Sequence, residues 1–143
     1  MNPFRGARSR SAASRNSQPR GVAVVELAVC LPIVVLITFA TVEACQMLHV
    51  RQTLKVTAFE AARIGAIPNA TSGNVRGQTQ ALLNDQRIVD FEIRLTPSDP
   101  KNLRDGDPLE VTLSASAGSN ALLGNWFYQD REISQTVSIL AHR

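Results

Sequence analysis

The sequence predicts an α+β protein, in which a long N-terminal helix, transmembrane and then amphipathic, precedes a small three-stranded antiparallel sheet. Residues 22–48 are almost entirely apolar, and a bilayer core takes about 20 such residues. The apolar pattern then continues at helical spacing as far as residue 66. Farther along, three segments alternate apolar and polar residues between turn-rich stretches. A sheet laid against one long helix accounts for all three observations.

Residues 1–21 form a basic, polar leader with five arginines and no acidic residue. Their Arg-, Ser-, Asn- and Gln-rich composition predicts disorder. The rest of the chain holds ten Lys and Arg against twelve Asp and Glu, so the leader accounts for the net charge of +3 and the pI of about 9.4. Positive charge gathered at one terminus is typical of topology control or targeting. It gives no support to nucleic-acid binding, and we expect no nucleic-acid partner.

Residues 22–48 predict a transmembrane helix. Sixteen uncharged residues separate Glu26 from Glu43. A cleaved secretory signal is the alternative, but the apolar run exceeds the usual core of about 7–15 residues. Pro32 interrupts the run, and membrane helices tolerate proline, typically with a kink.

Residues 49–66 continue the helix outside the membrane, because an apolar stripe persists while charged residues occupy the other faces. Gly65 and Pro68 form a helix stop, so one helix of about 65 Å spans residues 22–66. We expect its second half to pack on the sheet. The stripe consists of Met47, Leu48, Val50, Leu54, Val56, Ala58, Ala61, Ala62 and Ile64.

The sequence predicts a small exterior α+β domain at residues 67–143. A short helix is expected at 74–85, and strands are expected at 90–96, 109–115 and 132–142. Residues 97–108 are rich in turn formers, and residues 121–128 form an apolar, aromatic segment before the last strand.

The two cysteines, Cys30 and Cys45, both lie in the predicted helix. Fifteen residues of helix rise about 22 Å, whereas a disulfide needs Cα atoms within about 7 Å. They cannot pair with each other, and we interpret both as small apolar side chains.

No arrangement of residues in the sequence indicates catalysis or a cofactor. His49 and His142 have no acid or cysteine at ligand spacing, and no phosphate loop, CxxC or HExxH motif is present. Asp99, Asp105 and Asp107 share one loop, which could suit calcium. The spacing lacks a later bidentate acid, so a solvated turn is favoured. We therefore expect no enzyme activity, no metal and no cofactor.

Glu26 is the most informative residue. A carboxylate at the centre of a membrane segment costs roughly 2.5–3.5 kcal/mol on insertion scales, so such a charge usually has a function. Glu26 lies near the end of the apolar run, five residues after Gly21. The order is a basic leader, a glycine, four apolar residues, the carboxylate and a long apolar helix.

Residues 20–26, which run from Arg20 and Gly21 to Glu26, resemble the processing site of type IV pilin-like proteins. More closely, residues 20–66 resemble the TadE-like family, the minor pseudopilins of tight-adherence (Flp) pilus systems. The matching features are Arg-Gly before the cut, Glu26, Leu31-Pro32, Glu43 and the Ala61-Ala62-Arg63 run before Gly65. Family members often carry Gly-Arg after the second glutamate, where this chain has Cys45-Gln46.

The resemblance implies a pilin-like fold and a prepilin peptidase that cuts between Gly21 and Val22 at the cytoplasmic face. It implies a minor subunit in the bacterial inner membrane, with the lipid bilayer, other pilin-like subunits and pilus assembly proteins as partners. The leader arginines favour a cytoplasmic N-terminus and an exterior C-terminus. Pro32 is interpreted either as an ordinary kink or as a flexible point used when the helix leaves the bilayer and enters a fibre. The alternative is an uncleaved, single-pass envelope protein whose exterior domain binds a partner.

Overall fold

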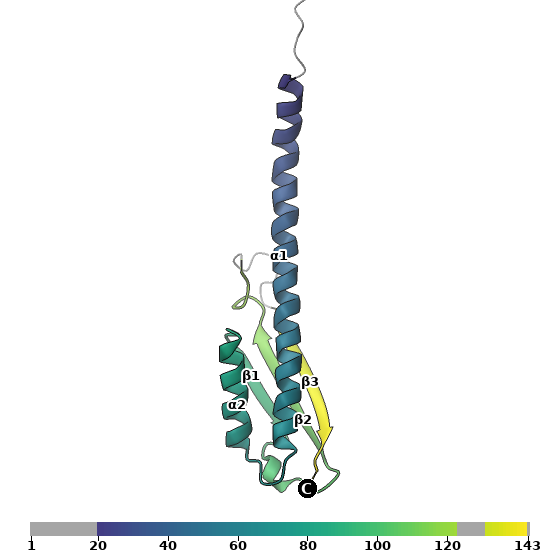
Figure 1. Ribbon diagram of the computed structural model, residues 1–143, viewed down its shortest axis with the longest axis vertical. Helices are drawn as coiled ribbons and strands as arrows, with labels where there is room; N and C mark the ends of the chain where they lie inside the picture. Colours follow the sequence, from purple (N-terminus) through teal and green to yellow (C-terminus); the bar gives the residue numbers. More distant parts are fainter. Residues whose placement is uncertain (1–19, 123–130, 143) are drawn as a thin grey trace, which may run out of the picture. The chain divides into compact units, whose positions relative to one another are not determined.

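The predicted α+β fold is confirmed in a computed structural model that describes residues 20–122 and 131–142. Its elements are α1 (Arg20–Gly65), α2 (Ser72–Asp85), β1 (Phe91–Thr96), the 3₁₀ turn η1 (Pro100–Asn102), β2 (Pro108–Ser116) and β3 (Glu132–Leu140) (Figure 1). The chain divides into two units, residues 1–35 and residues 36–143. The N-terminal part of α1 belongs to the first unit. The rest of α1, together with α2 and the sheet, forms the second unit.

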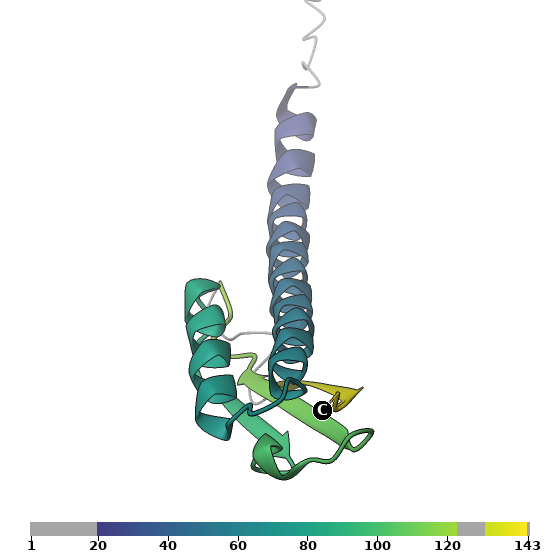
Figure 2. The ribbon, with the colours of Figure 1, turned by 60° about the horizontal axis from the view of Figure 1, so that its bottom comes forward.

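The sheet in the second unit is antiparallel, with the strand order β1-β2-β3. Ile93 of β1 lies opposite Leu113 of β2, and Val111 of β2 lies opposite Val137 of β3. Both helices lie on the same face of this sheet, with α2 on the side of β1 (Figure 2). The opposite face carries polar residues such as Glu92, Glu110 and Thr136.

The hydrophobic core lies between this face of the sheet and the two helices. The central strand β2 contributes alternate, fully buried residues, as its apolar–polar pattern predicts. Its partners on α1 recur at intervals of three or four residues, which place them on one face of the helix. The completely buried core residues include Val50, Leu54, Ala58, Val75, Leu83, Leu109, Val111 and Leu113.

The ends of the elements differ slightly from those expected, for local reasons. Helix α2 begins at Ser72, because the Oγ1 of Thr71 caps it by accepting a hydrogen bond from the amide of Asn74 at 3.3 Å. Strand β3 ends at Leu140, and the chain then turns back toward α1. The amide of His142 donates to the carbonyl oxygen of Ala66 at 3.2 Å.

Gly65 at the end of α1 packs closely against Leu109 of the central strand. A methyl group added to its Cα would overlap the Cδ2 atom of Leu109. The sequence indicates Gly65 only as a helix stop, whereas the structure shows that the position has no room for a side chain.

The predicted apolar stripe of α1 is only partly buried. Met47, Val50, Leu54, Ala58, Ala61 and Ala62 are buried. Leu48 and Val56 are 57% and 64% exposed, so the prediction that they belong to the buried stripe was wrong. Both lie toward the opposite side of the helix from Leu54, which a list of apolar residues does not reveal.

Candidate functional site

In the first unit, α1 after Arg20 is apolar apart from Glu26, and its apolar residues are exposed among the residues that the structure describes. Its large apolar residues from Val22 to Val34 are each more than half exposed. The most apolar window of 18 residues in the helix has a mean hydropathy of 2.7, with none of its residues buried. Among the described residues, α1 is the single helix long and apolar enough to cross a membrane. Such a surface requires a nonpolar surrounding, which a bilayer supplies.

Gly21, Val22 and Glu26 lie together near the start of α1. All three are exposed, and a Cβ on Gly21 would meet no atom within 4 Å. Val22 and Glu26 are four residues apart, so they share one face of the helix. The described part of the structure thus places the three residues of the predicted processing site on the first two turns of α1, with all three exposed among residues 20–35.

Pro32 lies inside α1, which continues through it without interruption. Proline has no amide hydrogen, so the carbonyl of Ala28, four residues earlier, receives no helical hydrogen bond from it. Pro32 lies between the processing residues and Glu43, and the structure does not bring it together with either.

Glu43 lies in the second unit and is 1% exposed. Met47 follows one turn later and is also buried, and Val50 is completely buried. Glu43 therefore begins the buried face of α1, whereas the sequence places it inside the transmembrane segment 22–48. The spacing of Glu43 from Met47, Val50 and Leu54 is consistent with one buried helix face, although a carboxylate is an uncommon member of a core.

Asn120, which follows β2, connects three parts of the second unit and was missed by the sequence analysis. Its Oδ1 accepts from the Val89 amide at 3.0 Å, and its Nδ2 donates at 2.8 Å to the carbonyl oxygens of Val89 and Ser116. The Nε2 of Gln46 on α1 donates to the Asn120 carbonyl oxygen at 3.3 Å. Of the apolar segment 121–128, residues 123–128 lie outside the described residues.

The three aspartates of the 97–108 loop stabilise the loop individually. Asp99 accepts a hydrogen bond from the amide of Lys101 at 3.2 Å, and Asp107 accepts one from the amide of Arg104 at 2.8 Å. Asp105 lies 3.5 Å from Nδ1 of His142. In residues 20–122 and 131–142, no three His, Cys, Asp or Glu residues are grouped so that they could hold a metal ion.

Comparison with known proteins gives one result, which concerns α1. No curated protein and no solved structure matches the chain. The helix that carries Gly21, Val22, Glu26, Pro32 and Glu43 is the matched part: residues 21–63 fit the model of the family described as TadE-like protein, which confirms the resemblance seen in the sequence.

Proposed function

We propose that this chain is a minor pilin-like subunit, a pseudopilin, that is anchored in the bacterial inner membrane and supports assembly of a tight-adherence (Flp) type IV pilus. The observation that carries the proposal is Glu26. It is an exposed carboxylate in the uncovered, apolar part of α1, within the stretch that matches the TadE-like family. An anchor that is never processed or assembled has little reason to keep a charge there.

The chemistry of assembly follows from the position of Glu26. A prepilin peptidase would cut between Gly21 and Val22 and leave a charged amino group on Val22. When the apolar helices of neighbouring subunits pack together, this amino group can pair with Glu26 of the next subunit. In surroundings of low dielectric constant the pairing offsets part of the cost of burying each charge.

Burial along α1 suggests where the helix leaves the bilayer. Glu43 and Met47 are buried in the second unit, so a span through residue 48 would place part of the folded domain in lipid. We therefore place the span at residues 22–42, which still provides the about 20 residues that a bilayer core requires. Residues 1–21 remain the cleaved leader, residues 43–66 the extramembrane helix and residues 67–143 the rest of the exterior domain.

The mass of the protein purified from its native cell tests this proposal. We expect a chain that begins at Val22. Gly21→Leu should retain the leader, because a bulky side chain replaces the glycine at the cut. Gly6→Leu, a matched change inside the leader, should still be processed. If the wild-type chain keeps residues 1–21, the uncleaved envelope protein with a partner-binding exterior domain becomes the better interpretation.

A further inference from the structure

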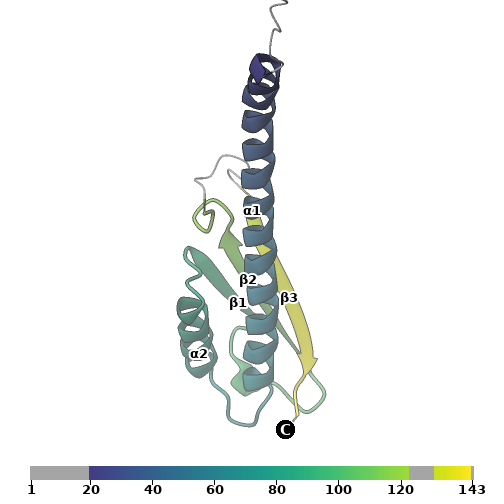
Figure 3. The same ribbon diagram turned by 45° about the horizontal axis from the view of Figure 1, so that its top comes forward.

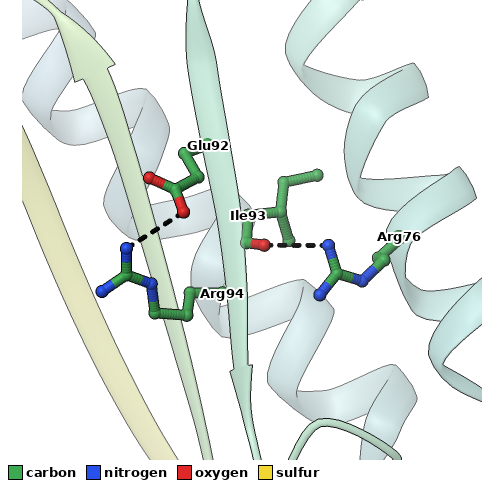
Figure 4. Close-up of polar contacts among 4 residues, drawn as sticks. All are labelled: Arg76, Glu92, Ile93 and Arg94. Atoms are coloured by element: carbon green, nitrogen blue, oxygen red, sulfur yellow. Dashed lines mark hydrogen bonds and ion pairs between the residues drawn. The ribbon is translucent and has the colours of Figure 1, made fainter.

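The two edges of the sheet differ in how they are protected. The outer edge of β1 faces α2, and Nη1 of Arg76 on α2 donates to the carbonyl oxygen of Ile93 at 3.0 Å (Figure 4). Strand β3 forms the other edge. In the part of the chain that the structure describes, no strand pairs with the outer side of β3.

The register shows which groups β3 presents at its open edge. At one end of the ladder the amide of Ala117 donates to the Arg131 carbonyl, and at the other end Ala141 donates to Asp107, each at 2.8 Å. Odd-numbered residues of β3 therefore bond to β2, and the backbone groups of even-numbered residues point outward. One outward group, the Ser134 carbonyl, accepts a hydrogen bond from the side chain of Gln135. The residues whose backbone groups point outward are Glu132, Ser134, Thr136, Ser138 and Leu140.

The composition of β3 offers little protection against pairing. Natural edge strands commonly carry lysine, proline, a bulge or an inward charge. Strand β3 is nine residues long, contains no lysine, proline or glycine, and has Glu132 at its first position as its single charge. A strand of this kind is a template for another strand.

A groove of about 520 Å³ lies beside the first half of this edge. Met47, Leu48 and Arg51 of α1 line one side. The other side is lined by β3 and the residue before it, and includes Ile133, Gln135 and the oppositely charged Arg131 and Glu132. A strand added to β3 would direct alternate side chains toward the groove. Apolar side chains would meet Met47 and Leu48, and a carboxylate could reach the guanidinium of Arg51.

Two arrangements of a second copy of this chain at the edge, antiparallel pairing of β3 with β3 and pairing of β3 with β1, are disfavoured. Strand β3 starts beside residues 44–51 of α1 and ends near Ala66, so it runs in the same direction as this part of α1 (Figure 3). Two-fold antiparallel pairing of β3 with β3 would therefore point the two α1 helices in opposite directions. Anchoring of both N-termini in one membrane, as proposed above, disfavours this arrangement. Pairing of β3 with the β1 edge of another copy is obstructed by α2 and Arg76.

We propose that the outer edge of β3 binds an extended segment of a different polypeptide as a fourth strand. In this segment, apolar side chains at alternate positions enter the groove. One acidic residue of the segment pairs with Arg51. Backbone hydrogen bonds supply affinity, and the groove supplies specificity, as in other cases of strand addition. The choice of a different polypeptide rests on the proposed membrane anchor, but the proposal does not depend on pilus assembly.

The test places a photoreactive benzoyl-phenylalanine at Leu48 in the full chain in its native cell. Irradiation should give an adduct with another polypeptide, and the cross-linked peptide should alternate apolar residues and contain an acid. Ser134→Pro removes an outward amide without removing a bond to β2, so it should reduce the adduct at least tenfold. Ser134→Ala keeps the amide and should leave the adduct unchanged.

Arg51→Glu, a change at an exposed position outside the sheet, should also reduce the adduct and does not depend on how β3 tolerates proline. Circular dichroism of each purified variant should show an unfolding transition close to that of the wild type. An adduct that contains two copies of this chain would overturn the proposal. So would the absence of an adduct, or an adduct that persists undiminished in both Ser134→Pro and Arg51→Glu.

Discussion

Gly65 shows how one residue determines the spacing between α1 and the sheet. Because it has no side chain, the last turn of α1 can approach Leu109 on the central strand, and both residues are buried. The fully buried Val75 of α2 lies on the same side, 3.5 Å from where a Cβ would be. An added Cβ would therefore force the Leu109 side chain to shift, whereas it would lie at ordinary van der Waals distance from Val75.

Gly65→Ala should destabilise the exterior domain by about 1–3 kcal/mol, the usual cost of overpacking a core. Gly77→Ala is the matched control, because Gly77 lies in α2 with nothing within 4 Å of the added carbon. This control should stabilise the domain by about 0.5–1 kcal/mol through helix propensity. Urea unfolding of the full chain in detergent, followed by circular dichroism, measures both. Equal effects of the two changes would show that Gly65 is only a helix stop.

Glu26→Ala should impair pilus assembly while leaving the exterior domain folded. Glu26 belongs to the first unit and contributes nothing to the core of the second. Membrane insertion should be unchanged or improved, because a charge has been removed from an apolar segment. Cells with this variant should contain normal amounts of the protein but fewer pili by electron microscopy. A normal pilus number, with normal co-purification of pilus proteins, would refute the assembly role.

At the scale of elements, the connection that follows β2 is fixed by Asn120. The side chain is 8% exposed and makes three hydrogen bonds to backbone groups of Val89 and Ser116. These bonds join the end of β2 to the segment that precedes β1. The carbonyl of Asn120 also receives the bond from Gln46, so the same residue connects the sheet with α1.

Asn120→Ala should destabilise the domain by about 1–3 kcal/mol, because buried backbone groups lose their partners. Ser119→Ala, next to it, removes an exposed hydrogen bond of 2.9 Å to Asp90 and should change stability by less than about 0.5 kcal/mol. Amide hydrogen exchange offers a second measurement, since the Val89 amide should exchange faster only in the Asn120 variant. Unchanged exchange there would mean that Asn120 does not hold the connection.

The sequence predicts elements well where local pattern and tertiary packing agree. The alternation of Leu109, Val111 and Leu113 predicts β2, and the same three residues are fully buried in the core. Prediction from the sequence fails where the burial or bonding of a residue depends on a partner from another part of the fold. Residue type alone does not distinguish the buried Leu54 from the exposed Val56, and the burial of Glu43 is indicated only by its helical spacing from Met47. Asn120 looks like an ordinary turn residue, because its bonding partner Val89 lies far away in the sequence.

In the candidate site, too, some features follow from local spacing and others depend on the tertiary structure. The position of Gly21, Val22 and Glu26 on one stretch of helix follows from their spacing alone. The groove beside β3 combines residues 44–51 with residues 117 and 131–135. Such a surface depends on strand order and on which edge α2 covers, and neither can be read from a single segment.

At the scale of the whole molecule, the orientation of the chain can be tested directly. The leader arginines predict that the N-terminus stays in the cytoplasm and that the chain after Gly65 lies outside. Protease added to spheroplasts should therefore digest the region after Gly65, with the exposed segment at Ile67, Pro68 and Asn69 as an accessible place for a first cut. Protection of this region in intact spheroplasts, with digestion after lysis, would show the opposite orientation.

The hydrogen bond between His142 and Ala66 has a consequence for how the protein matures. It joins the last described residue to the end of α1, and β3 completes the sheet just before it. Synthesis proceeds from the N-terminus, so the apolar face of α1 is made long before the strands that cover it. If the domain is exported as proposed, this face stays uncovered until the C-terminal residues have crossed the membrane. We expect chains that stop before β3 to remain open and to be removed by proteases of the cell envelope, so that only complete chains accumulate.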